Sequence, residues 1–166
     1  MSATVIPAHH ANCFGCGPDN PAGLHLQMHH DGRRVHAQLT LDHRHEGSPG
    51  YAHGGTVAAA LDDLFGGVLV LLVQPAVTAK LTVDYRAPVR LGRPLALTAW
   101  ADRVQGRKLH LKATMHDDDR LVAEADARFL AVSMDHFASS GTPLPDDFAT
   151  FARLSGQPAA TPEEIA

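Results

Sequence analysis

The residues of this chain that are best suited to chemistry are two glycines followed by a long apolar run. Gly54 and Gly55 come directly after His53, and residues 56–73 (TVAAALDDLFGGVLVLLV) are nearly all apolar. If this run is a helix, its first N–H groups have no partner within the helix, and the helix dipole adds partial positive charge there. The spacing therefore predicts a helix start that can bind an oxygen gaining negative charge.

Asp62 lies two turns into this expected helix, among side chains that are almost all apolar. A carboxylate in such surroundings costs solvation free energy, so we interpret Asp62 as a catalytic group in preference to a structural one. Asp63 is the fallback. Adjacent helix residues point about 100° apart, so one of the two carboxylates can face solvent while the other faces inward.

The spacing of Gly54 and Asp62 has a geometric consequence. The two residues are eight positions apart, which is roughly 12 Å along a helix. Both must come within about 3 Å of one reacting group to act on it. We therefore expect the carboxylate to come from a second subunit, with two such helices side by side.

Composition sets the class of protein. The chain has 166 residues, 45% of them hydrophobic, which suits one domain with a substantial core. A net charge of −4 without a Lys/Arg cluster argues against nucleic acid or an anionic membrane as a partner. Residues 1–10 lack a signal-peptide pattern, and the two adjacent carboxylates in residues 56–73 favour a helix buried in protein over a membrane span. With only two cysteines, a reducing, cytoplasmic location is expected.

The periodicity predicts one strand before the helix and four after it. Alternating apolar residues mark these strands at 35–41, 81–85, 95–99, 109–115 and 121–129. Short links between the late strands suggest an antiparallel meander, with the helix against one face of an α+β layer.

Three regions follow from this pattern. They are an irregular lead-in segment (residues 1–23), a domain over 24–133, and a tail over 134–166 with a short helix from Asp146 to Leu154. The prolines and glycines of the first and last regions separate them from the periodic domain.

Four ordered segments carry a family resemblance: CFGCGPDNPAGLHL at 13–26, GYAHGGTVAAALDD at 50–63, YRAPVRLG at 85–92 and QGRKLHL at 105–111. Together they resemble the hotdog-fold acyl-CoA thioesterases of the phenylacetate-pathway type. The resemblance implies an antiparallel sheet wrapped around one long buried helix, and hydrolysis of an acyl-CoA thioester. No cofactor is expected, because coenzyme A is part of the substrate. Non-catalytic acyl-CoA or small-ligand binding and hotdog hydratase chemistry remain the alternatives, since one fold hosts several functions.

The resemblance also assigns catalytic roles. The Gly54 N–H would polarise the thioester carbonyl, with His53 and Gly55 shaping the turn. Asp62 would act as general base on water or as nucleophile. Thr78 would position water near that carboxylate, although an ordinary strand threonine is an equal interpretation.

Substrate contacts are assigned less directly. Some relatives carry Asn or Gln six residues before the histidine, where this chain has Gly47. Ser48 or Glu46 is the expected substitute, and Asp63 is a further substrate-binding candidate. Three basic residues are candidates for the coenzyme A phosphates: Arg103, Arg107 and Lys108.

The expected assembly is a homodimer with active sites at the interface, or a dimer of such dimers. Gly66 and Gly67 would allow the close helix approach or leave room for the acyl group.

Cys13 and Cys16 form a Cys-x-x-Cys pair that allows a zinc or redox interpretation. Structural zinc needs about four ligands, and the candidates near in sequence are His9, His10 and His25. A thioredoxin-like pair would start a helix after a strand, which this segment does not predict. We therefore interpret the cysteines as free thiols in a tight turn, with no metal site.

Overall fold

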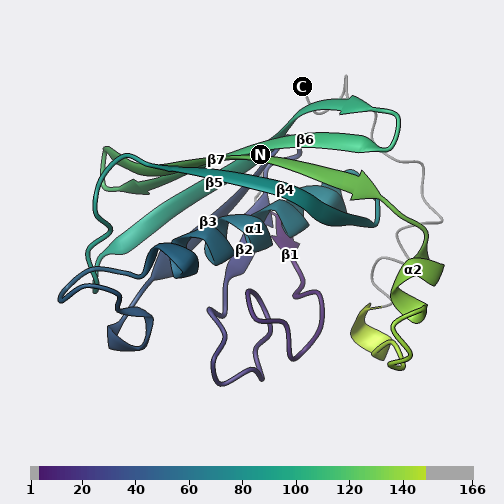
Figure 1. Cartoon of the computed structure of the whole chain (residues 1–166), viewed down its shortest axis with the longest axis horizontal. Helices are drawn as coiled ribbons and strands as arrows, with labels where there is room; N and C mark the ends of the chain where they lie inside the picture. Colours follow the sequence, from purple (N-terminus) through teal and green to yellow (C-terminus); the bar gives the residue numbers. More distant parts are fainter. Residues whose placement is uncertain (1–3, 149–166) are drawn as a thin grey trace.

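The computed structural model describes residues 4–148. Seven strands form one sheet in the order β1-β2-β3-β5-β6-β7-β4, and every neighbouring pair is antiparallel. The helix α1 (Gly54–Leu71) lies against one face of this sheet (Figure 1). The strands are β1 (Thr4–Ile6), β2 (Gln27–His30), β3 (Arg34–Thr40), β4 (Ala76–Tyr85), β5 (Pro94–Gln105), β6 (Lys108–Asp117) and β7 (Arg120–Ala131). Three short helices complete the list: η1 (His43–His45), α2 (Met134–Ala138) and η2 (Asp146–Phe148).

The apolar spacing of α1 explains its position. Its buried side chains recur at three- and four-residue intervals, so they form one stripe toward the sheet; they include Val57, Ala60, Leu61, Leu64, Phe65 and Val68. By length and composition α1 would also qualify as a membrane span, but in this fold it is the core helix. It ends at Leu71, and Val73 (φ 50°) and Pro75 follow and turn the chain away.

Small side chains in the sheet let the helix come close. Ala99, Ala113 and Ala125 are aligned across β5, β6 and β7, and all three are buried. Because alanine adds little height above the sheet, the larger residues of α1 fill the space at interior density. The chain thus builds its core with few aromatic residues.

The predicted sheet wrapped around one long helix is confirmed, with two differences. Three strands precede α1 instead of one, because β1 and β2 are only three and four residues long, too short to show a clear alternation. The meander runs only through β5, β6 and β7, while β4 pairs with β7 at the far edge. The segment 86–93 therefore carries the chain from an edge strand back to the sheet interior.

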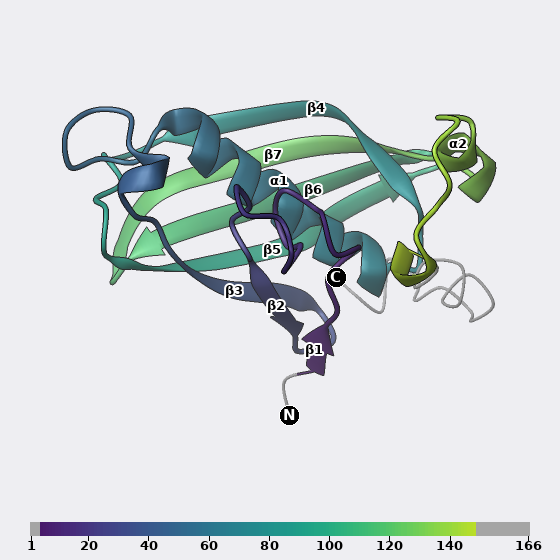
Figure 2. The same cartoon turned by 90° about the horizontal axis from the view of Figure 1, so that it is seen from below.

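The lead-in segment is more ordered than expected. It contains β1, and the part after β1 crosses the face of α1 that points away from the sheet (Figure 2). In the tail, η2 covers the first part of the helix predicted over 146–154, and residues 149–154 lie outside the described range.

Candidate active site

The start of α1 presents one N–H group with no acceptor in the described part of the chain. The Gly55 N–H donates to His53 Nδ1 at 2.9 Å, and the Thr56 and Val57 N–H groups donate to the His53 carbonyl at 3.0 and 3.3 Å. No residue in the range 4–148 accepts from the Gly54 N–H. His53 therefore caps the turn, and the Gly54 donor remains available to a bound oxygen.

Tyr85 fixes the same turn from the end of β4. Its hydroxyl donates to the Gly54 carbonyl at 2.7 Å. A side-chain carbon at position 54 would lie 3.3 Å from that hydroxyl, tighter than ordinary contact. Tyr85 is the first residue of the motif at 85–92, and its role could not be predicted because only the fold shows that β4 returns to the helix start.

A pocket of about 610 Å³ opens in front of Gly54. Ser48, one of the two residues predicted to substitute for the missing amide, lines this pocket together with Gly54. Its other lining residues are Tyr51, Ala52, Val57, Tyr85, Arg86, Ala87, Pro88 and Val89. The pocket is mostly apolar and includes Gly54 in its lining, which suits a thioester carbonyl with an apolar substituent.

The loop before His53 explains why position 47 is glycine. A side-chain carbon on Gly47 would lie 2.8 Å from His53 Cα, so an Asn or Gln cannot be placed there without moving the capping residue. Glu46 is engaged as well, because its Oε1 accepts the Gly50 N–H at 2.6 Å. Ser48 is therefore better placed than Glu46 to contact a ligand.

Asp62 contacts Thr78 across the helix–sheet interface. The Thr78 hydroxyl donates to Asp62 Oδ1 at 3.0 Å. Burial raises the pKa of Asp62, and the hydrogen bond from Thr78 opposes that rise because it favours the ionised carboxylate. A carboxylate with a raised pKa accepts a proton more readily, as a general base must.

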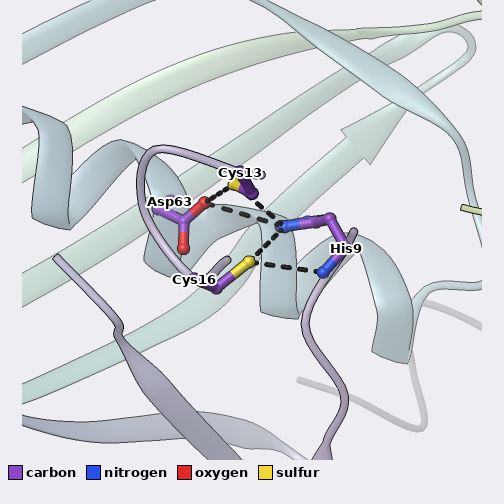
Figure 3. A group of neighbouring side chains, drawn as sticks. All are labelled: His9, Cys13, Cys16 and Asp63. Carbon is purple, nitrogen blue, oxygen red and sulfur yellow. Dashed lines mark hydrogen bonds and ion pairs between the residues drawn. The ribbon is translucent and has the colours of Figure 1, made fainter. Parts of the chain in front are cut away.

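Asp63 points in a different direction. It faces the lead-in segment, with its Oδ1 3.4 Å from Cys13 Sγ and 3.7 Å from His9 Nδ1 (Figure 3). Burial raises the pKa of Asp63 to about 7. The structure thus separates the two adjacent carboxylates, and it places Asp63 outside the pocket at Gly54.

One chain does not bring the carbonyl donor and Asp62 together. Gly54 is the first residue of α1 and contacts Tyr85 at one end of β4, whereas Asp62 contacts Thr78 near the other end. The continuous helix keeps them roughly 12 Å apart along its axis.

The three predicted phosphate-binding residues do not form one cluster. The Arg107 Nε donates to the Ala131 carbonyl at 3.1 Å, and Ala131 pairs with Ala76, two residues before Thr78. Arg107 and Lys108 therefore lie toward the Thr78 end of the sheet. Arg103 lines a separate hollow with Lys80, Lys112 and Arg128.

Comparison with known sequences agrees with this architecture. The profile of the thioesterase superfamily matches residues 49–124. Acyl-coenzyme A thioesterase THEM4 of Xenopus laevis is 38% identical over 87 residues, which cover 51% of this chain and 39% of that protein. This chain thus spans less than half the length of that relative. A Pseudomonas aeruginosa protein with an esterase name is 30% identical over 100 residues, covering 58% of this chain and 75% of its own.

Solved structures show the same fold. A thioesterase superfamily protein superposes with a TM-score of 0.68 and 28% identity, covering 72% of this chain and 60% of the other. A thioesterase superfamily protein from Shewanella loihica superposes with a TM-score of 0.58 and 25% identity, covering 65% and 91%. The phenylacetic acid operon protein PaaI of E. coli, at 17% identity and a TM-score of 0.61 over 66% of this chain and 81% of its own, shares the hotdog fold. With its helix-wrapping sheet, its matching profile and these relatives, the chain belongs to the thioesterase superfamily.

Proposed function

We propose that this protein hydrolyses an acyl-CoA thioester to the free acid and coenzyme A. The observation that carries the proposal is the Gly54 N–H at the start of α1, which has no acceptor among residues 4–148 and belongs to a residue that lines a mostly apolar pocket. The name of the Xenopus relative, an acyl-coenzyme A thioesterase, supports the substrate class.

The thioester carbonyl oxygen accepts the Gly54 N–H. Its partial negative charge grows as the carbonyl carbon becomes tetrahedral, so the donor and the helix dipole stabilise the transition state more than the bound substrate. Tyr85 and His53 hold the turn in place through their bonds to Gly54 and Gly55. This preorganisation avoids reorienting the donor during the reaction.

Asp62 of the partner subunit supplies the second function. As a general base it takes a proton from water, whose oxygen bonds to the carbonyl carbon. The carbon–sulfur bond then breaks, and the coenzyme A thiolate leaves and takes up a proton. As a nucleophile, Asp62 would form an anhydride with the acyl group that water then hydrolyses to the same products. Thr78 orients the Asp62 carboxylate in either case.

Two of the basic residues proposed to bind the coenzyme A phosphates support the same division of the site between two chains. Arg107 and Lys108 lie toward the Thr78 end of the sheet. In a two-fold dimer, one subunit would thus contribute Gly54 and its pocket, and the other would contribute Asp62 and basic groups for the coenzyme A phosphates. This arrangement extends the proposal of a shared site to substrate binding.

A thiol-release assay over aromatic, short, medium and long acyl-CoAs tests the function. Wild type should release coenzyme A from at least one class, and Asp62→Asn should lower that rate by roughly 10²- to 10⁴-fold while keeping the fold. Asp63→Asn should leave most of the rate, because Asp63 faces away from the pocket. Binding of acyl-CoA by wild type without any thiol release would instead identify a binding protein. Loss of turnover in Asp63→Asn with near-normal turnover in Asp62→Asn would show that the carboxylate is misassigned.

A further inference from the structure

Four side chains with metal-binding atoms converge between the lead-in segment and α1. They are His9, Cys13, Cys16 and Asp63. Each offers one atom that could bind a metal, and these four atoms all lie within 4.8 Å of one another (Figure 3). Three come from the lead-in segment and one from the helix, so the cluster joins parts of the chain that are about 50 residues apart. Metal binding is one of few reasons to gather an imidazole, two sulfurs and a carboxylate this closely.

The distances fit tetrahedral zinc. With zinc bonds of about 2.3 Å to sulfur and 2.0–2.2 Å to nitrogen or oxygen, the ligand atoms should be about 3.3–3.8 Å apart. His9 Nδ1 lies 2.9 Å from Cys16 Sγ, 3.9 Å from Cys13 Sγ and 3.7 Å from Asp63 Oδ1. Cys13 Sγ lies 3.4 Å from the same carboxylate oxygen. Three of these four separations lie within about 0.4 Å of the tetrahedral values, and the two remaining pairs of ligand atoms are at most 4.8 Å apart.

Glycines are placed where the cluster requires close approach. A side-chain carbon on Gly15 would lie 2.0 Å from the Asp63 carboxyl carbon, and one on Gly66 would lie 2.4 Å from the His9 ring. A side-chain carbon on Gly17 would lie 2.3 Å from the Cys13 backbone nitrogen. The turn around the cysteines and the helix surface below it can meet only with these three positions bare.

The surroundings of the donor atoms also fit a metal. The backbone N–H of His9 donates to Cys16 Sγ at 3.3 Å. Such a bond stabilises a thiolate, the form that binds zinc. In the described part of the chain, Asp63 Oδ2 is buried without a hydrogen-bond partner. A cation bound to this carboxylate would offset the cost of leaving that oxygen buried without a partner.

We propose that His9, Cys13, Cys16 and Asp63 bind one zinc ion that fastens the lead-in segment to α1. Four protein ligands leave no open position, so the ion is structural and takes no part in thioester chemistry. Two thiolates and one carboxylate around a divalent cation leave one net negative charge, and binding releases the thiol protons. No metal site was predicted from the sequence, because the fourth ligand, Asp63, lies on the helix about 50 residues from the cysteines.

Metal content of the reduced protein, purified through a tag without histidines, tests the proposal. After chelator treatment and incubation with ZnCl₂, gel-filtered wild type should retain one zinc per chain by elemental analysis. Cys13→Ser, His9→Asn and Asp63→Asn should lose it. The matched controls are His10→Asn, an adjacent imidazole, and Asp62→Asn, the adjacent carboxylate, and both should keep the full zinc content.

Cobalt substitution gives a readout that does not depend on the variants folding. Wild type loaded with CoCl₂ should show thiolate-to-cobalt charge transfer and the strong visible bands of tetrahedral coordination. Zinc that never rises above background overturns the proposal, as does zinc that all ligand variants retain. A Cys13–Cys16 disulfide in freshly purified, metal-free protein, detected by mass spectrometry, overturns it as well.

Discussion

At the scale of single residues, two adjacent carboxylates on α1 separate into two environments. Asp62 meets Thr78 on β4, and Asp63 meets the lead-in segment. The sequence supported a role for Asp62 through its apolar surroundings and its spacing from Gly54. It could not predict the surroundings of Asp63, because no periodicity links that residue to Cys13. The hydrogen bond between Thr78 and Asp62 could not be predicted from the sequence either. The sequence left open whether Thr78 positions water or is an ordinary strand threonine.

Thr78→Val tests whether this hydrogen bond tunes the catalytic carboxylate. The bond favours the ionised form of Asp62 and so lowers its pKa against the effect of burial. Without it the pKa of Asp62 should rise, and the acidic limb of the kcat/KM profile should move to higher pH. The loss of rate should therefore be largest in acid and smaller toward neutral and alkaline pH. Thr82→Val, an exposed threonine on the same strand, is the control and should leave the profile in place. A uniform rate loss at every pH would contradict a role in tuning Asp62.

At the scale of elements, the long periodic segments were predictable and the short ones were not. The apolar stripe of α1 and the alternation in β5, β6 and β7 identify those elements, because burial of one face imposes the period. β2 forms by pairing with β3, and β1 forms by pairing with β2, a tertiary effect that leaves little pattern in three or four residues. The position of β4 beside β7 depends in the same way on the path of the segment 86–93.

The segment 86–93 is attached to the sheet through Asp117, the buried last residue of β6. Asp117 accepts hydrogen bonds from Arg90 at 2.7 and 3.1 Å and from Arg93 at 3.1 Å. These contacts hold the pKa of Asp117 below its usual range, and the hydrogen bonds from Arg90 have the largest effect. A lowered folded-state pKa gives stability that is present above the unfolded pKa of about 3.9 and is lost as pH falls through the folded value.

Asp117→Asn should therefore lower Tm at pH 7, and the difference from wild type should shrink as the pH is taken from 5 toward 2. Thermal unfolding followed by circular dichroism at each pH measures this. Asp126→Asn provides the control. The Asp126 side chain is 63% exposed, and its ion pair with Lys112, at 3.6 Å, lies at the surface. This substitution should therefore change Tm little at any pH. A Tm difference for Asp117→Asn that stays constant or grows in acid would show that the two arginine contacts do not stabilise the fold in this way.

At the scale of the whole molecule, the proposed active site requires two chains. The helix geometry that led to this expectation is present, since Gly54 and Asp62 lie on one continuous helix and contact opposite ends of β4. β4 is an edge strand of ten residues, so its backbone is available to pair with a second copy. Two helices side by side would then bring Gly54 of one chain to Asp62 of the other.

Subunit mixing tests this central claim most directly. Gly54→Val adds bulk where the thioester approaches the backbone, and Asp62→Ala removes the carboxylate, so each variant alone should be nearly inactive. Random exchange makes about half of all dimers mixed, and each mixed dimer has one site with intact Gly54 and intact Asp62. Thiol release should return to roughly a quarter of the wild-type rate. Size-exclusion chromatography of each variant first shows that it still dimerises, and Asp62→Ala mixed with Asp62→Asn should recover nothing. Exchanged, well-folded mixtures of Gly54→Val and Asp62→Ala that remain inactive would contradict the account and place each site within one chain.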